Sequence, residues 1–175
     1  MEKSVTKNTK PLADDEIRNI YIDKDVWLGK IKSLKGLVDF CVIGSDYGEW
    51  MCALGRLDLL RWQIKTVREN GMIPVSISHW ASVAIPLFDK EDFAAHWTYA
   101  NKAWMYMNPE SAKSSIQATT KPITAFKILN NLNLPDEIES MISQLKTLGV
   151  KSFVVGLESP EHIRSTMPRI MKSLK

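Results

Sequence analysis

Four side chains that could do chemistry stand at or just after the ends of apolar, strand-like runs, namely Asp46, His79, Lys127 and Glu158. Carboxylates and an imidazole can exchange protons with a substrate near neutral pH. Asp46, His79 and Glu158 could also hold a divalent metal, but three ligands scattered over strand ends occur often by chance, and we name no metal site. A lysine among apolar residues can act as a base or as a Schiff-base nucleophile. We take the four as candidate catalytic residues.

Lys127 has both a chemical and a structural interpretation. Alternation along its strand predicts that it shares a face with Ile123 and Ala125, whereas Phe126 faces the covering helices. An ammonium packed between sheet and helix would lose its hydration without a partner, so the inner face is the more favourable location. There Lys127 either takes part in chemistry or only pairs with Glu158 on the neighbouring strand.

The earlier strand ends are open to two interpretations as well. His79 and Asp46 would lie at the same edge of the sheet, unless alternation with Val75 and Ile77 turns His79 outward. The run at 96–104 reads HWTYANKAW, and its polar and aromatic side chains could line a pocket for a sugar or a ring. The same aromatic side chains are equally suited to packing against helices.

Five strands alternating with helices are expected to position these residues. Apolar runs predict the strands at 37–45, 71–78, 96–104, 122–129 and 151–157. Helical spacing and capping residues predict helices at 25–36, 57–70, 108–116, 135–148 and from 160 onward, with a short helix or loop at 81–93 and a loop at 46–56. Short connections require parallel strands and right-handed crossovers, so the chemistry gathers where the carboxyl ends of the strands meet.

The predicted fold class is α/β, a partial TIM (β/α)8-type barrel of about five parallel βα units. A closed barrel takes about 250 residues, and this chain has 175. We expect a loose amino-terminal arm at 1–22, with one short helix, and a single α/β domain at 23–175. The chain is then either a fragment of a longer protein or an open sheet whose edges are covered by a second copy or a complementing chain.

Composition excludes several classes of protein. The chain is 45% hydrophobic and 25% charged, with a net charge of +3, as in a folded globular domain. Its charges are interspersed and no basic stripe occurs, so no nucleic-acid partner is expected. No run approaches the ~20 apolar residues of a membrane span, and a cytoplasmic location with no membrane partner follows by default. Cys41 and Cys52 have no metal-binding spacing and are expected to be free thiols.

Three segments carry a family resemblance, at 55–79, 108–129 and 149–162. The second contains KPITAFKIL and the third contains GLESPEH, which is the most specific part. Over about residues 37–172 the chain resembles the carboxyl-terminal portion of TIM-barrel proteins related to the aldo-keto reductases. It is most similar to a poorly characterised bacterial and archaeal group in which a KPxxAFKxL strand recurs.

The resemblance implies an oxidoreductase with NADPH as a possible cofactor. Aldo-keto reductases take their catalytic Asp, Tyr, Lys and His from the amino-terminal half of the barrel, and no position of this chain matches them. Their loop after the last strand cradles the adenosine end of NADP, and Ser159, Pro160 and Glu161 match that loop. Gly156 and His162 stand where these reductases often place cationic residues. Gly156, Ser159 and Glu161 are the candidate cofactor-binding residues, although Ser159 could simply cap a helix.

We expect a small-molecule enzyme that acts on a carbonyl or sugar-like substrate at the carboxyl ends of the strands. A reductase would need the nicotinamide cofactor, whereas a sugar isomerase or an aldolase would use a metal or the lysine. The alternative is a catalytically inactive partial barrel that binds a ligand or a partner subunit. Fold resemblance by itself does not decide between them.

Overall fold

A five-stranded, all-parallel sheet forms the centre of the molecule. The computed structural model describes residues 11–99, 108–129, 135–157 and 159–174. The strands lie in sequence order, β1-β2-β3-β4-β5, with bounds β1 Phe40–Gly44, β2 Ile73–Ser78, β3 His96–Tyr99, β4 Ile123–Phe126 and β5 Ser152–Val154. The predicted alternation of parallel strands with helices is confirmed, and the architecture is consistent with a partial barrel. The last part of the strand predicted at 96–104 lies outside the described residues.

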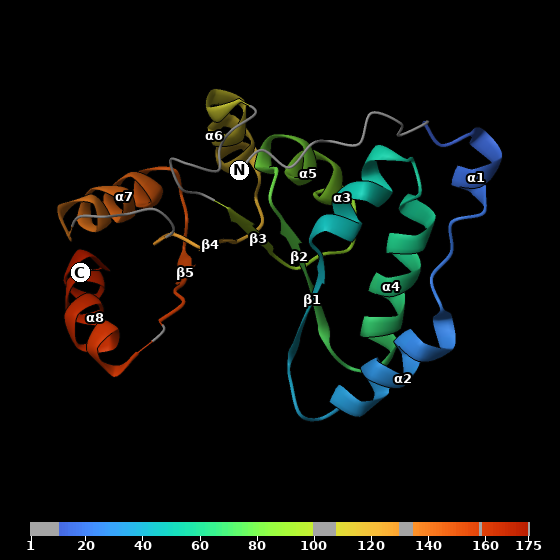
Figure 1. Ribbon diagram of the computed structural model, residues 1–175, viewed down its shortest axis with the longest axis horizontal. Coiled ribbons are helices and arrows are strands. Elements are labelled where there is room, and N and C mark those ends of the chain that lie inside the picture. Colours follow the sequence, from blue (N-terminus) through green and yellow to red (C-terminus); the bar gives the residue numbers. More distant parts are fainter. Residues whose placement is uncertain (1–10, 100–107, 130–134, 158, 175) are drawn as a thin grey trace, which may run out of the picture.

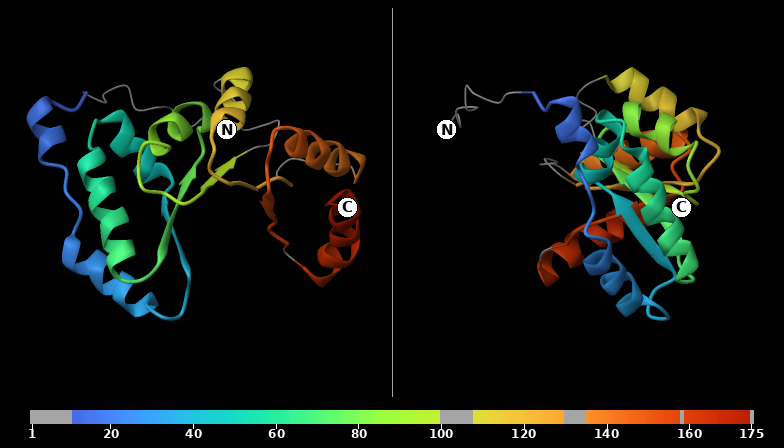
Figure 2. Two further views of the ribbon diagram at one scale, coloured as in Figure 1. Left: turned by 180° about the vertical axis from the view of Figure 1, so that it is seen from behind. Right: turned by 90° about the vertical axis from the view of Figure 1, so that its right-hand side faces the viewer.

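The helices of the described residues are α1 Asp14–Arg18, α2 Lys24–Leu34, α3 Asp46–Ala53, α4 Leu57–Glu69, α5 Ala81–Phe88, α6 Pro109–Ala118, α7 Pro135–Thr147 and α8 Pro160–Leu174. Helices α4 to α8 cover one face of this sheet. Helices α4 to α8 follow one another along an arc with the strands on its inner side (Figure 1). From behind, α7 and α8 lie beside β5, at the opposite end from α1, α2 and α4 (Figure 2). In the described part of the chain, no helix is long and apolar enough to cross a membrane.

Helix ends follow the capping residues that the sequence offers. Gly36 and Gly71 have φ angles of 78° and 80° just after α2 and α4, as expected for glycines that end helices. The side chain of Asn108 accepts a hydrogen bond from the Ser111 backbone N–H at 3.0 Å, which caps α6. The prediction of Asp25 as the cap of α2 is wrong. The cap is Asp23, which accepts from a backbone N–H three residues later.

The loop predicted at 46–56 is wrong over most of its length, because α3 occupies 46–53. Gly48, inside α3, lowers the intrinsic helix propensity of this segment. In the fold this glycine gives room to α5, since a Cβ on Gly48 would lie 3.4 Å from the ring of Phe88. Gly48 and Met51 are both buried. Tertiary packing therefore outweighs local propensity in this segment.

The assignment of faces on β4 also needs correction. Ile123 and Ala125 belong to the buried cluster that packs against α5 to α8, so they face the helices and not the inside. Phe126 lies on the opposite face, where its ring stacks on that of Tyr99 with centroids 4.4 Å apart. β4 ends at Phe126, and Lys127 has a φ angle of 54°. This turn breaks the alternation on which the prediction for Lys127 depended.

The described part of the predicted amino-terminal arm contains the expected short helix, α1, and is tied to the domain. The Arg56 guanidinium donates to the carbonyl oxygens of Ile17 at 2.9 Å, Arg18 at 3.0 Å and Ile20 at 2.6 Å. It also forms a two-point ion pair with Asp58. One side chain thus holds the segment that leads into α2, and Ile20 packs against the buried cluster of α2 to α5.

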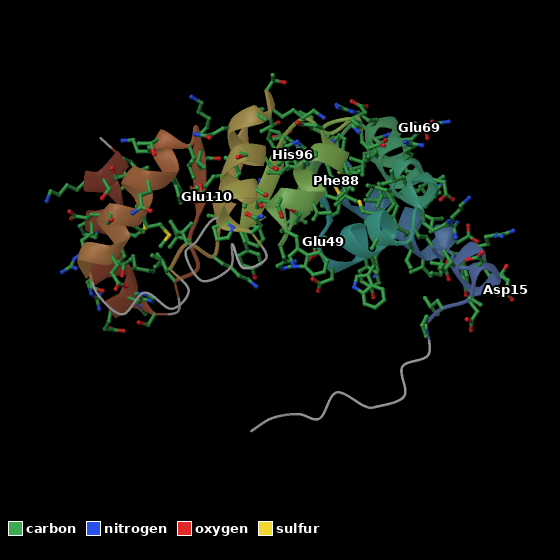
Figure 3. All side chains as sticks on the ribbon, turned by 90° about the horizontal axis from the view of Figure 1, so that it is seen from above. Asp15, Glu49, Glu69, Phe88, His96 and Glu110 are labelled. Carbon is green, nitrogen blue, oxygen red and sulfur yellow. The ribbon has the colours of Figure 1, made fainter. Side chains whose placement is uncertain are left out.

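A buried polar network lies between β2, β3 and α5. The imidazole of His96 is 1% exposed, with Nε2 2.8 Å from Asp89 Oδ1 and Nδ1 2.6 Å from Ser76 Oγ. Nε2 donates to the carboxylate, so Nδ1 of the neutral ring accepts from the hydroxyl. Figure 3 shows His96 in the middle of the molecule, near Phe88, whereas Asp15 and Glu69 lie at its margin. His96, at the start of the aromatic run at 96–104, therefore does not line a pocket.

Burial sets the titration of this network. It lowers the pKa of His96 below its ordinary value of 6.5, because a charged imidazole loses its hydration there. Partial burial raises the pKa of Asp89, but hydrogen bonds from Thr119 and His96 outweigh it and keep the pKa below its ordinary value of 3.8. In both cases the unfolded chain binds a proton more readily than the folded chain, so acid favours unfolding.

We predict that the free energy of unfolding falls as pH drops through about 6.5, with a slope of at most about 1.4 kcal/mol per pH unit for this one imidazole. Urea denaturation between pH 7.5 and pH 5 measures it. Substitution His96→Leu should lower stability at pH 7.5 and flatten the slope, whereas the control His162→Gln should change neither. An equal slope in wild type and His96→Leu would contradict the prediction.

Candidate active site

A glycine turn brings Asp46 to the edge of the sheet where the carboxyl ends of the strands lie, here termed the carboxyl edge. Gly44 has a φ angle of 119°, and a Cβ on it would lie 2.7 Å from the Ile77 carbonyl oxygen. The backbone N–H of Ser45 donates to that same oxygen at 2.7 Å. Only glycine fits this close approach without strain. The turn is thereby fastened to β2, and α3 begins at Asp46.

His79 lies between two carboxylates at the carboxyl edge. Its Nδ1 is 3.1 Å from Asp46 Oδ1 and 3.4 Å from Glu49 Oε2. The imidazole is 20% exposed, the Asp46 side chain 77% and the Glu49 side chain 4%. β2 ends at Ser78, so strand alternation does not turn His79 away. The predicted proximity of Asp46 and His79 is confirmed, and the sheltered carboxylate beside them is Glu49.

Glu49 is the site residue that the sequence interpretation missed. Its Oε1 accepts hydrogen bonds from the backbone N–H groups of His79 and Trp80, the latter at 3.0 Å. It therefore fixes the backbone at the start of α5 while its second oxygen faces the imidazole. The signal in the sequence is the spacing from Asp46: residues three apart share a helix face. That signal carries weight only if 46–53 is recognised as a helix.

Aromatic rings and a lysine extend the site along the carboxyl edge. The ring of Tyr99, 2% exposed, has its centroid 4.5 Å from that of His79 and stacks on Phe126. The Lys127 ammonium lies 4.8 Å from the centroid of the Tyr99 ring, within the range of a cation–π interaction. The chain therefore brings a carboxylate pair, an imidazole and an ammonium together through one aromatic platform.

The remaining predicted residues that the structure describes, Gly156, Ser159 and Glu161, lie on the β5 side of the sheet. Glu158 is outside the described residues, so its pairing with Lys127 stays a prediction. Gly156 follows β5 in a segment without regular structure. The hydroxyl of Ser159 accepts from the His162 backbone N–H at 3.1 Å, which makes it the cap of α8. Glu161 forms an exposed ion pair with Arg164 at 2.8 Å. The contacts of these residues are those of a capped helix, and NADPH binding here stays a prediction.

Among the residues that the structure describes, Asp46, Glu49 and His79 form the set that could hold a metal. Each offers one ligand atom, and these atoms all lie within 4.8 Å of one another. Carboxylate oxygen and imidazole nitrogen are ligands that Zn²⁺ or Mn²⁺ accepts. Glu49 Oε1 already accepts two backbone N–H bonds, so Oε2 is its available ligand atom. The three side chains could therefore either ligate a divalent cation or support acid–base chemistry at the imidazole.

Comparisons with known proteins do not identify the chain. No protein-family model matches it. A search of curated proteins gives no significant match. Function is therefore inferred below from the chemistry of the carboxyl edge.

We predict that Glu49→Ala lowers the free energy of unfolding by about 2–4 kcal/mol, because it leaves two sheltered N–H groups without an acceptor. Glu49→Gln keeps an acceptor oxygen and should cost less than half as much. Urea denaturation of the two variants measures the difference, with Glu69→Ala on the exposed side of α4 as a control of negligible effect. Equal losses for Glu49→Ala and Glu49→Gln would contradict the acceptor role.

Proposed function

We propose that this chain is a small-molecule enzyme that moves a proton on a carbonyl or sugar-like substrate at the carboxyl edge. The observation that carries the proposal is the partly exposed imidazole of His79, held 3.1 Å from Asp46 and 3.4 Å from Glu49. An imidazole oriented by carboxylates is the usual arrangement of a general base. Three of the four expected catalytic residues, Asp46, His79 and Lys127, have roles in the proposed reaction.

The proton transfer uses the two nitrogens of His79 differently. Nδ1 faces the carboxylates, so Nε2 is the nitrogen left for a substrate. Nε2 removes a proton from the carbon beside a carbonyl group, the C–H electron pair forms a C=C bond, and negative charge develops on the carbonyl oxygen. Asp46 and Glu49 stabilise the imidazolium that forms, and the ammonium of Lys127 attracts the developing oxyanion. In a 2-hydroxy carbonyl substrate, the hydroxyl proton on the deprotonated carbon then passes to the oxyanion, and the abstracted proton returns to the former carbonyl carbon. The carbonyl group has moved by one carbon, and no oxidant or reductant is needed.

Exposed aromatic side chains near this edge support a substrate with a sugar-like or ring-shaped body. Trp80, directly after His79, is 43% exposed, and Trp50 and Tyr47 on α3 are 61% and 79% exposed where this helix borders the neighbouring cavity. Large exposed aromatic residues next to polar groups are typical of small-molecule and sugar-binding surfaces.

A metal-assisted reaction at the same residues is the second candidate. It is favoured by the three ligand atoms of Asp46, Glu49 and His79 within 4.8 Å. A bound divalent cation would polarise the substrate carbonyl. Reduction with NADPH has less support, because the Ser159 hydroxyl already caps α8 and Glu161 adds negative charge beside that helix start.

The test is deuterium uptake from D₂O into a panel of trioses, pentoses and hexoses, followed by proton NMR. Exchange should occur at the carbon beside the carbonyl of at least one sugar. His79→Asn should slow it by about 100-fold or more, whereas His162→Asn on α8 should leave it unchanged. Circular dichroism checks that both variants are folded. No exchange with any sugar, or equal exchange with His79→Asn, would reject the proposal.

The metal dependence of the same exchange separates the two candidates. Acid–base catalysis by His79 alone predicts full exchange in the presence of EDTA. The metal-assisted reaction predicts loss of exchange in EDTA, recovery with Mn²⁺, and Mn²⁺ binding by calorimetry that Asp46→Asn weakens. Asp25→Asn, near the start of α2, is the matched control and should bind Mn²⁺ as the wild type does.

A further inference from the structure

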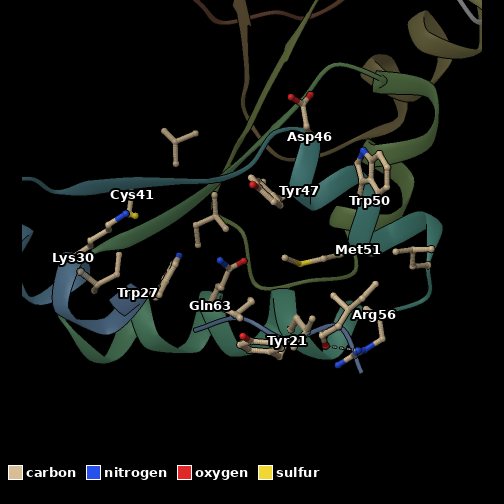
Figure 4. Close-up of a pocket in the computed structure, with 18 residues that line it drawn as sticks. Tyr21, Trp27, Lys30, Cys41, Asp46, Tyr47, Trp50, Met51, Arg56 and Gln63 are labelled. Atoms are coloured by element: carbon tan, nitrogen blue, oxygen red, sulfur yellow. Dashed lines mark hydrogen bonds between the residues drawn. The ribbon is translucent and has the colours of Figure 1, made fainter. Parts of the chain in front are cut away.

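A cavity borders Asp46, and His79 is not among the residues that line it. It has a volume of about 870 Å³, within the range of roughly 300–1,000 Å³ that small-molecule sites occupy. Its walls come from residues 20–22, α2, β1, α3 and α4 (Figure 4). It is distinct in its chemistry from the carboxyl edge, because most of its lining is apolar.

Hydrogen bonds and packing contacts hold the walls of this cavity in place. Ile20 and Ile22 form one side, and Trp27, Ile31 and Met51 line the others. The segment that contains Ile20 is held by the Arg56 hydrogen bonds to the carbonyl oxygens of residues 17, 18 and 20. The ring of Trp27 packs against that of Trp62, with ring centroids 5.4 Å apart. The opening is therefore part of the fold and not a gap beside a detached segment.

Gln63 is the polar group at the centre of the cavity wall. Its side chain lies on the cavity face of α4 and points toward the hollow in Figure 4. Gln63 is 9% exposed, and its amide has no hydrogen-bond partner among the residues that the structure describes. Buried amides are nearly always hydrogen-bonded in proteins. Gln63 therefore presents both a donor and an acceptor to whatever occupies the cavity.

The charges around the cavity favour a neutral occupant. Arg56 lines it, but its guanidinium is committed to three carbonyl groups and to Asp58. Cys41 also lines it, and burial raises the pKa of this thiol, which stays protonated at neutral pH. Lys30 and Asp46, which are of opposite charge, also border the cavity. Only a neutral polar group matches an amide that both donates and accepts.

We propose that this cavity binds a neutral, mainly apolar small molecule whose amide, or a similar neutral hydrogen-bonding group, pairs with Gln63. The apolar body of the ligand displaces water from Ile20, Trp27 and Met51, which supplies most of the affinity. The amide of Gln63 supplies orientation and selectivity, because a ligand without a matching group leaves it unpaired. The proposal is independent of the chemistry assigned to His79.

Octanamide is the probe, and calorimetry measures its binding to the full chain. Wild type should bind it, and Gln63→Leu should weaken binding by about tenfold, since one or two neutral hydrogen bonds are lost. Gln117→Leu, the same change on the exposed side of α6, should have no effect. Gln63→Leu should be at least as stable to urea as wild type, because it removes an unpaired buried amide.

A second readout is the alkylation of the two cysteines by N-ethylmaleimide, resolved by mass spectrometry. Octanamide should slow the reaction of Cys41, which lines the cavity, and leave that of Cys52 unchanged. Cys52 is outside the lining, and burial with nearby carboxylates raises its pKa to about 11. This comparison uses the wild-type chain and so does not depend on how a variant folds.

Four results would overturn the proposal. Octanamide could fail to bind up to its solubility limit, or bind Gln63→Leu as tightly as wild type. Alkylation of Cys41 could proceed at the same rate with and without octanamide. Light scattering could reveal a dimer that Gln63→Leu dissociates, in which case a second copy of the chain, and not a small molecule, occupies the cavity.

Discussion

The buried carboxylate of Glu49 is the contact on which the carboxyl edge depends. It comes from α3, which follows β1, and it accepts backbone hydrogen bonds from His79 and Trp80, which follow β2. Two connections that are separate in sequence are thereby fixed to one another. The second carboxylate oxygen faces His79 Nδ1, so the group that shapes the backbone also orients the imidazole. Structural and chemical roles coincide in one side chain, because one carboxylate oxygen accepts the backbone hydrogen bonds while the other faces the imidazole.

Two histidines, His79 and His96, contact carboxylates within the part of the chain that the structure describes, and exposure to solvent distinguishes them. His96 contacts a serine and an aspartate, the residue types of a hydrolase triad, but the imidazole and Ser76 are each 1% exposed. The Ser76 hydroxyl lies in the middle of a strand and faces helices, where no substrate reaches it. His79 has 20% of its side chain exposed at the carboxyl edge. Position in the fold, and not residue type, therefore decides which of the two histidines can reach a substrate.

Asp46 borders both the carboxyl edge and the apolar cavity. The turn at Gly44 makes this possible, because the chain approaches β2 within hydrogen-bonding distance before α3 begins. Asp46 and Glu49 of α3 then face His79. Met51, later in the same helix, lines the cavity. A single strand-to-helix connection thus separates a polar site from an apolar one, as is common where loops carry function on a rigid sheet.

The sequence by itself determined the five parallel βα units, the helix ends at glycines and the location of Asp46, His79 and Lys127 near one edge. These follow from local signals: apolar periodicity, capping residues and the rule that parallel strands end together. Only the tertiary structure decided that Glu49 joins them, that His96 is buried, and that Lys127 reaches the Tyr99 ring. Those outcomes depend on where each strand stops, on one positive φ angle and on contacts between residues 20 to 40 positions apart, which periodicity along the chain does not encode.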